Sequence, residues 1–153
     1  MIDESLVIRK VSHSVLQGYL GLQPEPLQYL ERQQKFESNE VEVIIQIVGQ
    51  MYGQVLCTMD KETVKQMISR LMGGIEVHQL DEMCWSAFQE FGNWIASGIA
   101  TELSAQGILV NITHPIIQEG NSVIHSPNKY LVVPIATEIG VIEIYMKLDK
   151  NRN

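Results

Sequence analysis

The chain has 153 residues, of which 45% are hydrophobic and 19% are charged, so it can bury a core in one domain without disulfide or metal staples. The formal net charge is -7 and no basic block occurs, which argues against nucleic acid as a partner. No apolar run approaches the ~18 residues of a membrane span, and the N-terminus carries acids where a signal peptide carries bases. We therefore expect a soluble cytoplasmic protein with no membrane partner, in which Cys57 and Cys84 are buried thiols.

The first forty residues contain one clear helical pattern. Apolar residues recur near the helical period over 3–20, which predicts an amphipathic helix that ends near Gly18 or Gly21. Two prolines within 23–26 predict a turn, because each proline restricts itself and the residue before it to non-helical angles. The mixed, largely polar residues 27–40 are compatible with a further strand.

The next segment reads as two strands and a short helix. Alternating apolar residues over 41–48 predict a largely buried strand. A tight connection over 49–53 and a second strand over 54–59 follow. Asp60 is suited to cap a short helix, which we expect to stop at Gly73.

The longest predicted helix covers residues 81–106. Asp81 is a suitable N-cap, and Gly107 is a C-terminal stop. On a helical wheel the apolar side chains fall on one face. These residues are Cys84, Phe88, Phe91, Ile95, Ile99 and Leu103. We expect this face to lie on the core of the domain.

Only strand-like runs follow the long helix. They cover 108–113, 116–117, 122–125, 130–137 and 141–148, and the last two read as a hairpin. Strands and helices do not alternate as in βαβ units. The chain therefore predicts a single α+β domain with about three helices on one face of a mainly antiparallel sheet.

Polar side chains form a narrow stripe on the long helix, opposite its apolar face. Ser86, Glu90, Asn93 and Ser97 are four, three and four residues apart, so they stack along one line. We call these four residues the polar stripe.

Two apolar side chains, Met83 and Trp94, lie about a quarter-turn away from the polar stripe on the same wheel. A large apolar ring beside exposed polar groups suggests a docking contact for another molecule. Two plainer explanations remain open. Any surface helix carries small polar residues, and a dimer partner or a loop of this chain could cover Trp94 and Met83.

Other motifs typical of catalytic or ligand-binding sites are missing from the sequence. It has no phosphate-binding glycine loop and no Gly-x-Ser-x-Gly nucleophile motif. The four histidines are scattered singly without the spacing of metal ligands, and no base lies near either cysteine in the sequence.

The residues of the polar stripe resemble the sequence motif of a known family. Ser86-x-x-x-Glu90-x-x-Asn93, followed about twenty-two residues later by Pro115, resembles the signature of the CheC/CheX phosphatases of bacterial chemotaxis. A single Glu-x-x-Asn occurs, which is closer to CheX than to two-site CheC proteins. The resemblance covers roughly residues 41–148. It also includes the glycine-containing segment before the second strand, Leu71-Met72-Gly73-Gly74, and Val132-Val133-Pro134.

The resemblance implies a function, a partner and roles for the residues. The family's substrate is phospho-CheY, a receiver-domain response regulator that carries an aspartyl phosphate. By analogy, Asn93 orients the attacking water, Glu90 pairs with the receiver's active-site lysine, and Ser86 gives a supporting contact. Pro115 would shape the strand edge beside the helix. The resemblance further implies a homodimer formed through exchanged or paired edge strands.

The residue types are consistent with this chemistry. A carboxamide can donate and accept hydrogen bonds at once, so it can hold a water in line with a phosphoryl group. Phosphoryl transfer depends mainly on positioning and charge stabilisation. The sequence offers no magnesium site of its own, so we expect Mg²⁺ in the partner receiver. A non-catalytic binding module for a receiver or a flagellar switch component is the main alternative, and a plain assembly interface is a further one.

Overall fold

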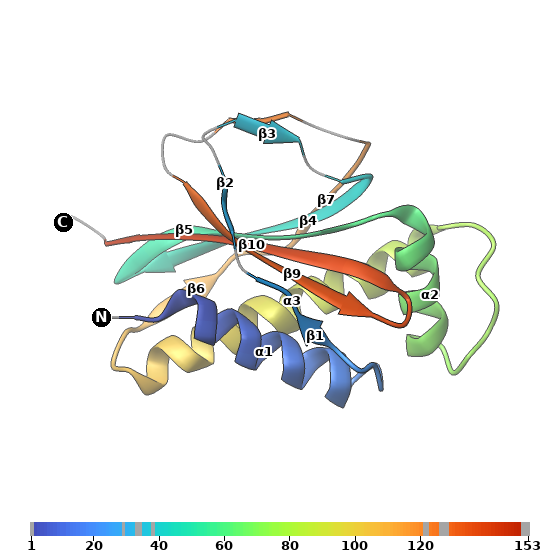
Figure 1. Cartoon of the computed structure of the whole chain (residues 1–153), viewed down its shortest axis with the longest axis horizontal. Helices are drawn as coiled ribbons and strands as arrows, with labels where there is room; N and C mark the ends of the chain where they lie inside the picture. Colours follow the sequence, from blue (N-terminus) through green and yellow to red (C-terminus); the bar gives the residue numbers. More distant parts are fainter. Residues whose placement is uncertain are drawn as a thin grey trace.

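The fold is an antiparallel sheet with three helices on one face (Figure 1). The computed structural model describes residues 2–28, 30–32, 35–37, 39–120, 123–125 and 129–150. The predicted α+β class and the placement of the helices are confirmed. No helix within these residues is both long and apolar enough to cross a membrane.

The three helices lie within their predicted ranges, and α2 and α3 begin directly after the caps that the sequence indicates. They are α1 (Glu4–Gly18), α2 (Lys61–Leu71) and α3 (Glu82–Ala105). Each follows an aspartate whose carboxylate accepts a backbone N–H of the first turn, which satisfies a donor that the helix leaves open. These aspartates are Asp3, Asp60 and Asp81.

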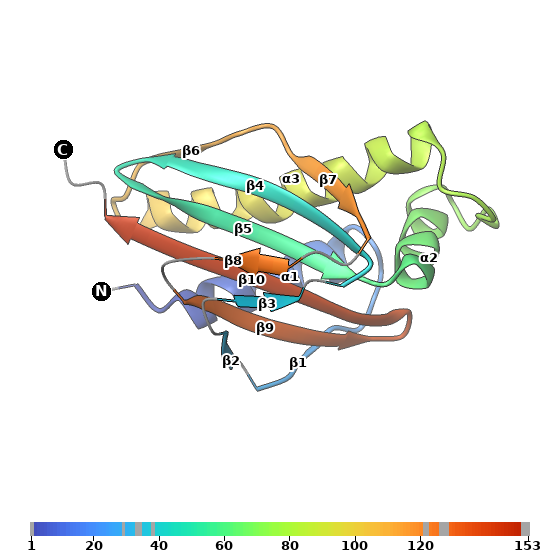
Figure 2. The ribbon, with the colours of Figure 1, turned by 90° about the horizontal axis from the view of Figure 1, so that it is seen from above.

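The main sheet has the strand order β1-β9-β10-β5-β4-β6, while β2 also pairs with β9 and β7 also pairs with β4. Its strands are β1 (Glu25–Pro26), β2 (Leu30–Arg32), β4 (Val41–Gly49), β5 (Met51–Met59), β6 (Val110–Ile112), β7 (Ile116–Glu119), β9 (Tyr130–Thr137) and β10 (Gly140–Lys150). Figure 2 shows β6 and β7 following one another along the outer edge of β4. A separate pair, β3 (Lys35–Glu37) and β8 (Val123–His125), lies above the face opposite the helices (Figure 1).

The main core fills the space between the sheet and the helices. Alternate residues of the central strands, including Val43, Ile45 and Cys57, are buried against the apolar faces of the helices. Burial raises the pKa of the Cys57 thiol to about 12, which favours the neutral thiol. A smaller cluster on the other face contains Leu56, Tyr130, Val132 and Tyr145.

Two predictions about connections are wrong. Residues 23–26 do not form only a turn, because Glu25 and Pro26 pair with β9 at the edge of the sheet, where a missing N–H is tolerated. The tight connection predicted over 49–53 is shorter, since β5 already begins at Met51. Gly53 lies inside this strand, and a Cβ there would stand 1.9 Å from the Lys147 carbonyl oxygen.

The remaining strand predictions are correct in kind. The predicted hairpin of the last two strands is β9 and β10, and the run predicted over 108–113 is β6. The strand predicted over 122–125 is β8, although Ser122 lies outside the described residues. β8 pairs with β3 rather than with its sequence neighbour β7, because β7 is taken up by the edge of β4.

Candidate functional site

Helix α3 presents the polar stripe because its opposite face is fixed in the core. The predicted apolar face is confirmed, and all six of its side chains are buried. Gly92 brings this face close to the sheet, because a Cβ at this position would stand 2.8 Å from a methyl carbon of Val43. Gly98 similarly lets α3 approach Val11 of α1. The helix is therefore held closely against the sheet and α1.

The start of α3 is also well defined. The carboxylate of Asp81 accepts the backbone N–H of Cys84 at 3.0 Å. This hydrogen bond lowers the pKa of the Asp81 carboxyl, because it stabilises the charged form. Burial raises the pKa of the Cys84 thiol, which favours the neutral thiol, and Cys84 packs within the main core.

The structure brings Ser86, Glu90 and Asn93 together on the exposed crest of α3. Residues three or four apart on a helix have Cβ atoms about 5–6 Å apart. Within the described chain, the side chains of these three residues make no hydrogen bond or ion pair with other protein groups. A partner could therefore bind the carboxylate and the carboxamide without first breaking contacts inside this chain.

The sheet edge borders the polar stripe on one side. Pro115 is buried between β6 and β7, and the side-chain amide of Gln89 donates to its carbonyl oxygen at 3.2 Å. Pro115 thus lies at a strand edge beside the helix, and its role in shaping that edge stays a prediction. The sequence carries no local signal for the role of Gln89. Its bond could not be predicted, because the path of the chain around residue 115 is not a local property.

Helix α1 borders the stripe on the other side and covers Trp94. The ring of Tyr19, at the C-terminal end of α1, stacks on Trp94 with centroids 4.3 Å apart. Trp94 also packs against the main core and is half-buried. Residues of this chain therefore cover much of the Trp94 ring, as the explanation of a tryptophan covered within its own chain expects. Met83, by contrast, is 64% exposed in the first turn of α3.

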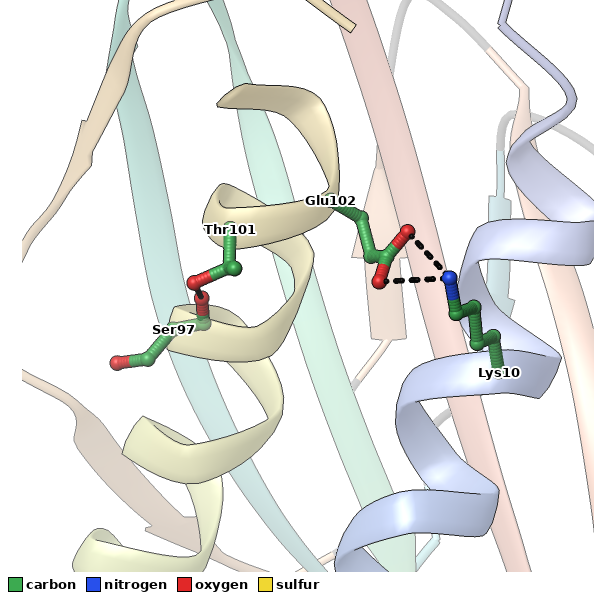
Figure 3. A network of polar contacts seen from close by, with 4 residues as sticks. All are labelled: Lys10, Ser97, Thr101 and Glu102. Atoms are coloured by element: carbon green, nitrogen blue, oxygen red, sulfur yellow. Dashed lines mark hydrogen bonds and ion pairs between the residues drawn. The ribbon is translucent and has the colours of Figure 1, made fainter. Parts of the chain in front are cut away.

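Farther along, α1 and α3 are joined by an ion pair (Figure 3). The ammonium of Lys10 lies 3.2 Å from both carboxylate oxygens of Glu102. The hydroxyl of Thr101 donates to the Ser97 carbonyl oxygen at 2.9 Å, and the Ser97 hydroxyl points away from α1. This exposed pair contributes little to stability, about 0–1 kcal/mol. The Glu102 carboxylate nevertheless neutralises the Lys10 ammonium close to the C-terminal end of the polar stripe.

The described residues contain no group of three or more His, Cys, Asp or Glu side chains that could hold a metal ion. The polar stripe offers one carboxylate, one carboxamide and two hydroxyls. These groups can form hydrogen bonds, pair with a cation and hold a water molecule.

Comparison with known proteins identifies the family. The sequence model of the family described as chemotaxis phosphatase CheX matches residues 41–136, which is more than half of the chain and includes the whole polar stripe. This chain belongs to the CheX family. The resemblance inferred from the stripe is thereby confirmed.

Individual CheX relatives agree with this assignment. The Thermotoga maritima protein named CheY-P phosphatase CheX is 36% identical over 94 residues, which are 61% of this chain and 61% of that protein. The match thus spans about three fifths of the relative's length.

Solved structures show the same CheX fold. A chemotaxis protein CheX from Desulfovibrio desulfuricans has a TM-score of 0.86 at 18% identity, covering 97% of this chain and 100% of that one. The CheX–CheY–BeF3–Mg²⁺ complex from Borrelia burgdorferi gives 0.70 at 24% identity, covering 98% of this chain and 100% of that one.

Proposed function

We propose that this chain accelerates hydrolysis of the aspartyl phosphate on a CheY-like receiver domain. The observation that carries the proposal is the exposed, unpaired presentation of Glu90 and Asn93 on one crest of a rigid helix in a CheX-family chain. The name of the Thermotoga relative and the presence of CheY in the Borrelia complex support the choice of substrate.

Asn93 is assigned to the attacking water. Its carboxamide oxygen can accept a hydrogen bond from the water while its NH₂ group donates to an oxygen of the phosphoryl group. The side chain is short and extends from a helix held by core packing, so the water would be held in a narrow range of positions. Positioning of this kind accounts for much of the catalysis of phosphoryl transfer.

Glu90 is assigned to docking. Its carboxylate would pair with a lysine beside the receiver's phosphorylation site, and this pairing would set the position of Asn93 relative to the phosphoryl group. Ser86 lies one turn earlier and would add a hydrogen bond at the rim. Met83 remains a candidate apolar contact because it is exposed. Trp94 would act mainly through its edge, because Tyr19 covers a face of the ring.

The receiver would supply the charge-neutralising groups. Aspartyl-phosphate hydrolysis requires stabilisation of negative charge on the phosphoryl oxygens, and a metal ion commonly provides it. We assign this role to Mg²⁺ bound by the receiver. The Mg²⁺ and BeF3 named in the Borrelia CheX–CheY complex are consistent with this division of labour.

The decisive experiment follows the decay of a radiolabelled phospho-receiver from the same genome, with this chain at catalytic concentration. The wild type should accelerate the decay, and Asn93→Ala should remove about 100-fold or more of the acceleration, as loss of a key polar group in a catalytic site often does. Asn111→Ala is the matched control, because Asn111 is an exposed asparagine on β6.

Two results would contradict the proposal. Equal acceleration by Asn93→Ala and the wild type would remove Asn93 from the mechanism. Binding to a receiver without any shortening of the phosphoryl lifetime would instead support a non-catalytic binding module.

A further inference from the structure

The edge of the sheet beside the polar stripe contains one extra residue. β6 pairs with β4 up to Ile112, opposite Ile47, and β7 resumes the pairing at Ile116, opposite Ile44. Residues 113–115 therefore face only two residues of β4. This two-against-three arrangement is a β-bulge, a feature that bends a strand and redirects its backbone groups.

The bulge is anchored at its first residue. The backbone N–H of Thr113 donates to the Gln46 carbonyl oxygen at 3.0 Å, and the Gln46 N–H donates to the Thr113 hydroxyl at 3.0 Å. Pro115 ends the bulge and has no N–H that would be left unpaired in this irregular stretch. The carbonyl oxygen of Pro115 accepts the Gln89 amide from α3.

This contact differs from the others between α3 and the sheet. In the part of the chain that the structure describes, Gln89 makes the single side-chain hydrogen bond between α3 and the sheet. The remaining contacts are apolar, and at Gly92 the helix meets Val43 without a side chain of its own. Apolar contact is non-directional, whereas a hydrogen bond fixes distance and angle. Gln89 therefore limits how far α3 can rotate or slide on the sheet.

We infer that Gln89 is a positioning residue, which sets the orientation of Asn93 through its hydrogen bond to the Pro115 bulge. The inference rests on the proposed function, because it concerns the same site. Gln89 lies one turn before Asn93 on the same side of α3, so a rotation of the helix at Gln89 is passed directly to Asn93. The bulge and its proline thereby fix the orientation of α3 on the sheet.

The two groups of the site should respond differently to such a rotation. Glu90 has a long side chain that can follow a small displacement by changing its torsion angles. Asn93 has a short side chain that cannot, and a misplacement of about 1 Å can cost about 100-fold in rate. Loss of the Gln89 bond should therefore lower kcat more than it raises KM.

The test compares Gln89→Met and Gln89→Glu with Gln66→Met, which makes the same exchange at an exposed position on α2. Methionine keeps the length of the side chain without a donor, and ionised glutamate keeps its shape without a donor. We expect both Gln89 variants to lower kcat about tenfold, with KM changed less than about twofold and the thermal midpoint close to wild type. Gln66→Met should have wild-type kinetics. Unchanged kcat in folded Gln89 variants, or a rise in KM alone, would overturn the inference.

A second readout separates this inference from the proposed function. The side-chain amide resonances of Asn93 in a ¹H–¹⁵N spectrum report its surroundings without any receiver. They should shift in Gln89→Met and remain in place in Gln66→Met. Unchanged Asn93 resonances in Gln89→Met would overturn the positioning role whether or not the wild type is a phosphatase. An inactive wild type with shifted resonances would refute the phosphatase proposal while supporting the contact between Gln89 and the bulge.

Discussion

Tyr19 lies flat against Trp94, with ring planes 13° apart, and so joins the end of α1 to the residue that follows Asn93. Tyr19 itself remains 61% exposed. The C-terminal end of α1 is held independently, because the Arg70 guanidinium of α2 donates to the Leu20 carbonyl oxygen at 3.3 Å. The polar stripe thus lies between a ring stack on one side and the Pro115 bulge on the other.

The ring stack should contribute measurably to stability. Tyr19→Ala removes the stacked ring and should lower the free energy of unfolding by about 1 kcal/mol, the typical value for an aromatic pair. A double-mutant cycle with Trp94→Leu, followed by urea unfolding, isolates this pairwise term. Additive effects of the two substitutions would show that the stack makes no net contribution. Tyr52→Ala is the control, because Tyr52 is an exposed tyrosine on β5.

Glu90→Gln should weaken docking more than chemistry. The substitution removes the charge that we expect to pair with the receiver's lysine, so KM should rise about tenfold, in line with a charged hydrogen bond of about 1.5–3 kcal/mol. The wild-type KM should also rise with salt, and this dependence should be smaller in the variant. Steady-state assays over a range of salt concentrations measure both. Glu76→Gln changes an exposed carboxylate in the connection between α2 and α3, outside the polar stripe, and should leave KM unchanged.

Gly53→Ala should prevent stable folding or reduce stability severely. A Cβ at residue 53 would overlap the Lys147 carbonyl oxygen, and this neighbour is backbone that cannot rotate away. Overpacking of this kind costs about 1–3 kcal/mol or more. Gly18→Ala is the matched control, because a Cβ there meets nothing within 4 Å. That control should be neutral or stabilising by up to about 1 kcal/mol, and thermal unfolding distinguishes the two variants.

The stabilisation of the N-terminal end of α3 by Asp81 should be lost in acid. Its folded-state pKa lies below the ordinary value of 3.8, so its stabilising effect is present above that value and is lost as the pH falls through the folded-state pKa. Asp81→Asn keeps a capping group but cannot titrate. The wild type should therefore be the more stable protein near pH 7, and the gap should close below about pH 4. Urea unfolding from pH 7 to pH 3 measures this difference in the free energy of unfolding. A difference that stays constant over this range would contradict the role of the Asp81 carboxylate.

The sequence could predict the features that depend on local patterns. The Asp60 and Asp81 caps, the apolar face of α3 and the stripe of Ser86, Glu90 and Asn93 all follow from local residue types and spacing. The order of elements was sufficient for the fold class. The family resemblance depended on the stripe and Pro115 taken together, because neither is specific alone.

Features that depend on contacts between distant segments could not be predicted. The cover over Trp94 comes from Tyr19, 75 positions earlier in the chain. The strand at Glu25 exists only because β9 has a free edge there. The bond from Gln89 to Pro115 requires a bulge whose extra residue is visible only from the pairing on both sides of it. The homodimer implied by the resemblance stays a prediction, which sedimentation equilibrium can test.

The bulge at 113–115 also has a consequence for solubility. An edge strand with a long, regular row of free backbone groups is a template for the strands of other molecules and promotes aggregation. Here the outer edge is divided into two short strands of three and four residues. Pro115, between them, has no N–H to offer an incoming strand. The irregularity that brings a carbonyl oxygen to Gln89 therefore also protects this side of the molecule against fibre-like growth.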